Sequence, residues 1–252
     1  MSSTAVLRRP ALRVLAALLA LLLVAAAGLV AWSRSGVMDA EPEAWQQVVE
    51  DPRIAQEQTG GALVLRPSDP PAPGVGLVFY PGAKVEPEAY AARLSGIVTE
   101  LGMTVVITDP PLNLSLFDRR DPERFASLAP EVDTWLVGGH SMGGVRACQV
   151  AEEVDALVLF AAYCATGLSH SQVPVLSIAG SEDGLSTPGD IADHRSALPE
   201  NATLVEIAGA NHASFGDYGP QKGDGTATID DDEVDDAVEE AVADLLAVVT
   251  AA

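Results

Sequence analysis

Residues 138–144 read Gly-Gly-His-Ser-Met-Gly-Gly, and an apolar run over residues 134–137 leads directly into them. The pattern Gly139-x-Ser141-x-Gly143 is typical of a nucleophile elbow, a sharp turn from a strand into a helix. A side chain at either glycine would collide with the neighbouring strand or with the first helical turn. The alternative is that Ser141 only caps a helix. The elbow interpretation therefore requires a base, an acid and an oxyanion hole elsewhere in the chain.

The length and composition of the chain limit its fold class and the partners it can bind. With 252 residues it is long enough for one large α/β domain with a substantial core, or for two small ones. Hydrophobic residues make up 48% and aromatic residues only 5%, which suits a parallel sheet covered by helices. The formal net charge of -22 argues against an extended surface for nucleic acid or anionic lipid. It indicates solubility in a salty or external medium.

Two cysteines occur, Cys148 and Cys164, without a C-x-x-C motif or the spacing of metal ligands. Neither a disulfide framework nor a zinc site is indicated. Cys148 comes seven residues after Ser141, within the expected helix, and Cys164 follows a predicted strand. We expect both to be small core residues rather than a disulfide pair.

The amino-terminal segment is predicted to be a separate unit. Residues 11–32 carry a single charge, Arg13, and as a helix would reach about 33 Å, enough to cross a bilayer core. Arg8 and Arg9 precede this stretch, whereas only Arg34 follows it closely. This asymmetry favours an amino end in the cytoplasm and a globular part outside it.

A cleaved signal peptide is the alternative for this segment, since residues 25–27 are three alanines. An apolar region of about 18 residues is long for a signal peptide. The Arg8-Arg9 pair only loosely suggests twin-arginine export. We therefore expect a membrane anchor or signal segment over residues 1–35, a polar tether over 36–60, and a catalytic domain over 61–252, outside the cytoplasm.

Apolar runs alternate with helical patterns after residue 60. Strands are predicted at residues 62–65, 75–80, 104–108, 134–137, 156–160, 175–179 and 203–207. Helices are predicted at residues 88–101, 123–128 and 233–249, with a short one at 45–49. The alternation predicts a mainly parallel, doubly wound α/β sheet. In such sheets the chemistry collects at the carboxyl ends of the strands.

Polar residues follow two of these strands. Asp183 comes after the run at 175–179, and His212 comes after the run at 203–207. The order Ser141, Asp183, His212 differs from the orders of trypsin-like and subtilisin-like proteases. His212 would take the proton of Ser141, and Asp183 would fix the imidazole tautomer. Glu182 is the competing acid, but Asp183 is favoured because it precedes Gly184 in a turn.

An oxyanion hole needs two backbone N–H groups aimed at the developing negative charge. Met142, directly after the nucleophile, would supply the first. Ala83, which follows Gly82 in the loop after the strand at 75–80, would supply the second. Lys84 either meets an anionic substrate or is simply exposed.

Four strings, FYPGAKVEPEAYA at 79–91, GGHSMGG at 138–144, IAGSEDGL at 178–185 and GANHASFGDYG at 209–219, carry a resemblance to a known family. Together they resemble the α/β-hydrolase superfamily, and within it compact, lidless members akin to dienelactone hydrolase and small bacterial esterases. The resemblance implies a serine hydrolase that works through an acyl-enzyme, with no cofactor. Dienelactone hydrolase has a cysteine where this chain has Ser141, so the resemblance does not carry over its substrate.

The connection after the strand at 156–160 is short. Only residues 161–172 lie there, too few for the helical cap found in many lipases. We expect an open site for short acyl esters, partly roofed by loops near residues 112–117, 163–168 and 215–221. Asp217, Tyr218 and Gln221 would either line the pocket or order a turn.

The predicted function is therefore a carboxylesterase-like serine hydrolase that acts on a small-molecule ester. It would associate with a membrane through its amino-terminal helix and would not bind nucleic acid or a metal. A membrane-anchored acyltransferase with the same triad is one alternative, and a non-catalytic binding protein of the same fold is another. The sequence does not indicate the oligomeric state.

Overall fold

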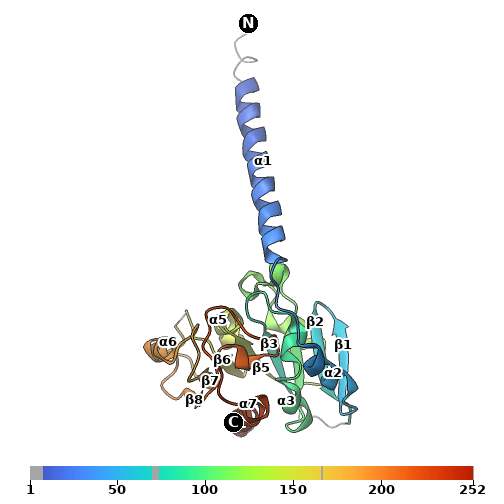
Figure 1. The fold of residues 1–252 in the computed structure, drawn as a ribbon, viewed down its shortest axis with the longest axis vertical. Coiled ribbons are helices and arrows are strands. Elements are labelled where there is room, and N and C mark those ends of the chain that lie inside the picture. Colours follow the sequence, from blue (N-terminus) through green and yellow to red (C-terminus); the bar gives the residue numbers. More distant parts are fainter. Residues whose placement is uncertain (1–7, 70–73, 166, 252) are drawn as a thin grey trace. The chain divides into compact units, whose positions relative to one another are not determined.

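The structure is a computed structural model that describes residues 8–69, 74–165 and 167–251. The chain divides into two compact units, Met1–Val37 and Met38–Ala252. The first unit contains α1 (Arg8–Ser33), drawn in dark blue in Figure 1. Its stretch Ala11–Ser33 has a mean hydropathy of 2.9 and is long and apolar enough to cross a membrane. Signal sequences share this length and composition. Residues 1–7 of the predicted amino-terminal segment lie outside the described residues.

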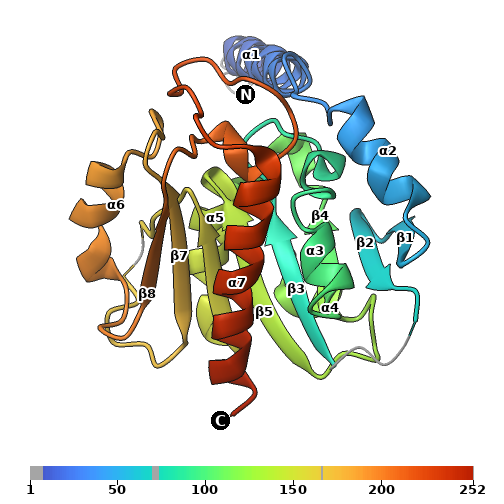
Figure 2. The same ribbon diagram turned by 60° about the horizontal axis from the view of Figure 1, so that its bottom comes forward.

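The second unit is built on an eight-stranded sheet with the order β1-β2-β4-β3-β5-β6-β7-β8 (Figure 2). The strands are β1 (Ile54–Thr59), β2 (Ala62–Pro67), β3 (Val75–Tyr80), β4 (Thr104–Thr108), β5 (Thr134–His140), β6 (Ala156–Phe160), β7 (Val175–Gly180) and β8 (Thr203–Ile207). Strands β4, β3, β5, β6, β7 and β8 run parallel, whereas β1 and β2 are antiparallel to their neighbours. The predicted mainly parallel α/β sheet is confirmed.

Helices cover both faces of the sheet because its central strands are apolar on both sides. In β3, Leu77 and Phe79 belong to one core cluster, and Val78 and Tyr80 belong to the other. Side chains that alternate in this way point to opposite faces. One face packs against α2 (Pro42–Glu50), α3 (Ser95–Thr99) and α7 (Asp231–Val249), and the other against α4 (Pro122–Ala126) and α5 (Met142–Val150). Figure 2 shows α3 and α7 in front of the sheet. A further helix, α6 (Pro188–Asp193), follows β7.

The segment expected to be a polar tether, residues 36–60, is instead part of the fold. It contains α2 and β1, and β1 pairs with β2 along its whole length. Met38 already forms a β-bridge with Val85. The sequence did not reveal β1 because it is an edge strand in which Ile54 is buried, whereas residues 56–58 are polar and partly or fully exposed. An edge strand of this kind shows no apolar run.

The helix predicted over residues 88–101 is also broken into shorter pieces. A 3₁₀ helix, Pro87–Tyr90, and α3 replace it. The apolar positions Tyr90, Leu94 and Ile97 are fully buried. The spacing therefore identified the buried side of the segment but not its break.

The expectation that Cys148 and Cys164 are separate core residues is wrong, because they form a disulfide bond. Both are buried as expected. Cys148 lies on α5 and Cys164 lies in the loop after β6, and α5 packs beside β6, which brings their Cα atoms to 5.6 Å. This separation is within the range that a disulfide needs. A spacing of 16 residues does not reveal such a contact.

Removing this disulfide is expected to destabilise the folded domain. It closes a loop of 16 residues, for which the chain-entropy model gives about 3 kcal/mol. Urea unfolding of the wild type should shift to a lower midpoint when reductant is added. The double variant Cys148→Ala/Cys164→Ala should unfold at this lower midpoint with or without reductant. Equal midpoints for the oxidised wild type and the double variant would contradict the prediction.

Candidate active site

Unusual backbone conformations gather at one edge of the sheet. Five described non-glycine residues have a positive φ angle, namely Lys84, Leu112, Asn113, Ser141 and Ala161. Each follows the carboxyl end of a parallel strand, after β3, β4, β4, β5 and β6 respectively. Strained residues of this kind concentrate at functional sites. This edge of the sheet is therefore the candidate active site.

Ser141 lies between β5 and α5, with φ 53° and ψ -121°. Its N–H donates to the carbonyl oxygen of Phe160 at 3.0 Å. A Cβ atom on Gly139 would overlap the backbone of Gly143, and one on Gly143 would overlap the carbonyl of Tyr80. The sharp strand-turn-helix that the sequence predicted is present, and glycine is required on both sides of Ser141.

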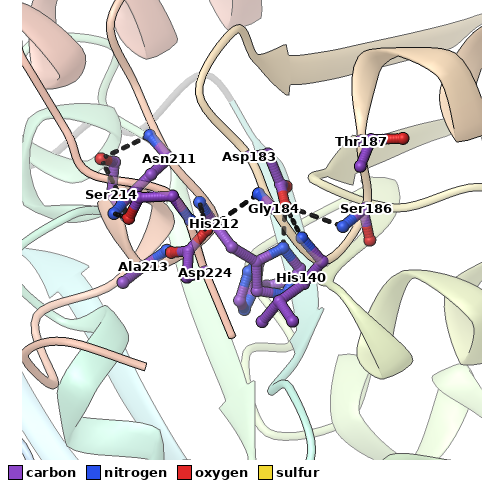
Figure 3. A network of polar contacts seen from close by, with 12 residues as sticks. His140, Asp183, Gly184, Ser186, Thr187, Asn211, His212, Ala213, Ser214 and Asp224 are labelled. Carbon is purple, nitrogen blue, oxygen red and sulfur yellow. Dashed lines mark hydrogen bonds and ion pairs between the residues drawn. The ribbon is translucent and has the colours of Figure 1, made fainter. Parts of the chain in front are cut away.

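Asp183 and His212 meet in a buried pair (Figure 3). Asp183 Oδ2 lies 2.8 Å from His212 Nδ1, and its Oδ1 accepts the N–H groups of Leu185 and Ser186, each at 2.7 Å. The carboxylate thus holds the ring with its proton on Nδ1, which leaves Nε2 free to accept a proton. The loops after β7 and β8 bring these two predicted residues together.

Glu182, the competing acid, has a different environment. It is exposed, and its carboxylate accepts a hydrogen bond from the Ser181 hydroxyl at 3.2 Å. Its own N–H donates to the carbonyl of Ala210. The geometry therefore favours Asp183 over Glu182 as the partner of His212.

Asp224 organises the same region and was not identified from the sequence. Its carboxylate accepts N–H groups of both loops: His212 at 3.1 Å, Ala213 at 2.9 Å and Gly184 at 3.1 Å (Figure 3). Asp224 therefore ties the loop that carries Asp183 to the loop that carries His212. Its sequence signal, an aspartate between two glycines, indicates a turn and nothing more.

The hydroxyl of Ser141 forms no hydrogen bond with any residue that the structure describes, His212 included. Ser141 itself is partly exposed, whereas the His212 side chain is buried. Hydrogen bonds between catalytic groups are often long without substrate and tighten when it binds.

The backbone donors expected of an oxyanion hole lie in two segments. In the loop after β3, Gly82 N–H donates to the Tyr90 hydroxyl at 2.9 Å, and Lys84 N–H donates to the carbonyl of Asn113 at 2.7 Å. Between them, Ala83 N–H has no hydrogen-bond partner within the described chain. Met142 is the first residue of α5, and the N–H at this position cannot be satisfied inside a helix.

His140 lies beside the pair of Asp183 and His212. It is buried, its Nδ1 is 2.9 Å from the Tyr90 hydroxyl, and its ring centroid is 4.5 Å from that of His212. Burial first, and then the charge that His212 carries when it is protonated, lower the pKa of His140 well below its ordinary value. His140 is therefore neutral next to His212.

The loop after His212 is held by contacts of its own side chains. Asp217 accepts the N–H of Arg93 at 3.1 Å and faces its buried guanidinium. Tyr218 is buried, and its hydroxyl donates to the side chain of Gln221 at 3.1 Å. These contacts order the turn, and Asp217 also lines a cavity beside it. Within the described residues, no group of three or more His, Cys, Asp or Glu side chains could hold a metal ion.

Comparisons with known proteins agree with this geometry. The family model described as alpha/beta hydrolase family matches residues 76–236. Among solved structures, the chain is similar to Est1E from Butyrivibrio proteoclasticus, with a TM-score of 0.55 and 14% identity, over 77% of this chain and 99% of that one. The search of curated proteins found no match. A match over more than half of the chain, on a sheet with this strand order and this elbow, places the protein in the alpha/beta hydrolase family.

Proposed function

We propose that this protein is a serine hydrolase that cleaves small carboxylic esters through an acyl-enzyme. The observation that carries the proposal is the buried hydrogen bond between Asp183 and His212, at the same sheet edge as the strained Ser141. A histidine held in this tautomer is a base for a nearby hydroxyl. Family membership supports the same reaction class.

In the proposed mechanism, His212 Nε2 takes the proton of Ser141 as its Oγ attacks the ester carbonyl. Asp183 stabilises the imidazolium that forms. The N–H groups of Ala83 and Met142 donate to the negatively charged oxygen of the tetrahedral intermediate. His212 then returns the proton to the leaving alcohol. Water repeats the sequence on the acyl-enzyme and releases the acid.

The proposed substrates carry short acyl chains. The described residues between β6 and β7, residues 161–165 and 167–174, contain no helix that could act as a cap. Phe117, in the loop after β4, is half exposed and offers apolar surface at the same edge of the sheet. An open site buries only a short part of an acyl chain, so it gains little from a longer one, since binding free energy follows the apolar area buried.

The proposed location is outside the cytoplasm. The disulfide between Cys148 and Cys164 supports it, because disulfides persist in oxidising compartments. The apolar stretch Ala11–Ser33, preceded by arginines, supports a membrane anchor or a signal segment with the same outcome for the catalytic unit. In this proposal the protein contacts the membrane through this helix only.

The proposal is tested by assaying the full chain in detergent with p-nitrophenyl acetate, butyrate, octanoate and palmitate. We expect kcat/KM to be highest for the two short esters. With added methanol, the free acid should remain the main product. A methyl ester as the main product would instead indicate an acyltransferase. A folded protein that turns over none of these esters would indicate a non-catalytic role.

A further inference from the structure

A buried tyrosine connects the two segments that carry the proposed oxyanion donors. The Tyr90 oxygen accepts the N–H of Gly82 at 2.9 Å and lies 2.9 Å from His140 Nδ1. We assign the one phenolic proton to the bond with His140 Nδ1, in the ring tautomer that carries its proton on Nε2. Tyr90 and His140 are both buried. With this assignment the hydrogen bonds run from Gly82 through Tyr90 to His140.

The two ends of this connection have particular neighbours in the chain. Gly82 directly precedes Ala83, and His140 lies two residues before Met142. A Cβ atom on Gly82 would lie 3.0 Å from both the Tyr90 oxygen and His140 Nδ1, so the three groups are in close contact. A shift of the Tyr90 oxygen would therefore move the Ala83 N–H relative to the Met142 N–H.

The surroundings hold Tyr90 in place. Its ring packs on Phe79, with ring centroids 5.1 Å apart, and on Tyr218 at 6.4 Å. His140 is neutral, so one of its ring nitrogens is an acceptor, and the assigned tautomer makes that nitrogen Nδ1. Tyr90 and His140 are both almost fully buried, so we expect their effect on the reaction to be indirect.

We infer that Tyr90 is a positioning residue, which sets the spacing between the Ala83 and Met142 N–H groups through its hydrogen bonds to Gly82 and His140. The inference rests on the proposed function. Loss of a whole oxyanion donor costs about 100- to 1,000-fold in kcat, and a displaced donor should cost part of that. The loss should fall on kcat rather than KM, because the donors act on charge that develops only in the transition state.

The test is Tyr90→Phe in the full chain, assayed with p-nitrophenyl butyrate. We expect kcat to fall about 10- to 100-fold with KM within about threefold of the wild type. Inhibition by phenylboronic acid, which forms a tetrahedral adduct on a nucleophilic serine, should weaken by a similar factor. The matched control is Tyr218→Phe, which also loses a buried hydroxyl in the same aromatic cluster, but one bonded to Gln221. This control should keep kcat within about threefold.

If Tyr90→Phe does not fold, a second pair of variants tests the positioning role of Tyr90. His140→Gln keeps an acceptor for the tyrosine proton and His140→Leu does not, so the glutamine variant should retain the higher kcat. The inference is overturned if Tyr90→Phe loses no more kcat than Tyr218→Phe, or if the two His140 variants are equally active. Both outcomes require an active wild type. A folded wild type without esterase activity would overturn the proposed function instead.

Discussion

Ser141→Ala is expected to lower kcat for p-nitrophenyl butyrate by about a million-fold, to the level that binding and the oxyanion hole alone provide. The variant removes the only atom that can form the proposed acyl-enzyme. The backbone at this position already has a positive φ angle, and alanine demands no more of it than serine does. The measurement is steady-state hydrolysis by the full chain, with thermal unfolding to show that the variant is folded.

Ser181→Ala is the matched control for this prediction. Ser181 directly follows β7, as Ser141 directly follows β5. Its hydroxyl accepts the N–H of Gly209, which is a structural contact worth about 1 kcal/mol. Its kcat should stay within a few-fold of the wild type. If Ser141→Ala hydrolyses the ester as fast as the wild type, the nucleophile is a different residue.

Asp183→Asn is expected to lower kcat about 10,000-fold. The asparagine can still accept the N–H groups of Leu185 and Ser186, so the loop should keep its conformation. It loses the negative charge that stabilises the His212 imidazolium, and its amide can hold the ring in the wrong tautomer. The measurement is kcat for the same ester across the pH range in which the protein is folded.

Glu182→Gln separates the two neighbouring carboxylates. Glu182 is exposed and bonded to Ser181, so its kcat should stay within about threefold of the wild type. A large loss in Glu182→Gln with a small loss in Asp183→Asn would transfer the acid role to Glu182.

The parts of the site that could be predicted from the sequence depend on local constraints. The elbow could be predicted because a Cβ atom on Gly139 or Gly143 would overlap backbone atoms a few residues away or on an adjacent strand. Asp183 and His212 could be predicted because parallel strands end at the same edge of a sheet. Residues that follow two neighbouring parallel strands therefore lie near each other. The apolar runs predicted the six inner strands, β2 to β7, since burial on both faces leaves a continuous apolar signal.

The parts that could not be predicted depend on contacts between distant residues. Tyr90 looked like one more apolar position of a helix, and its role appears only when Gly82 and His140 are placed beside it. Asp224 looked like a turn residue until its N–H partners in two loops were known. The disulfide required the packing of α5 beside β6, and β1 required its partner β2. None of these contacts leaves a periodic signal in the chain.

The measurement that tests the central claim most directly is covalent labelling of the full chain with a fluorophosphonate, followed by peptide mass spectrometry. A serine activated by a neighbouring histidine reacts with this reagent, whereas ordinary serines do not. We predict one equivalent of adduct on Ser141, formed much more slowly in Asp183→Asn and absent in Ser141→Ala. An esterase-active protein that is labelled at another residue, or that is not labelled at all, would contradict the assignment of Ser141, His212 and Asp183 as the catalytic triad.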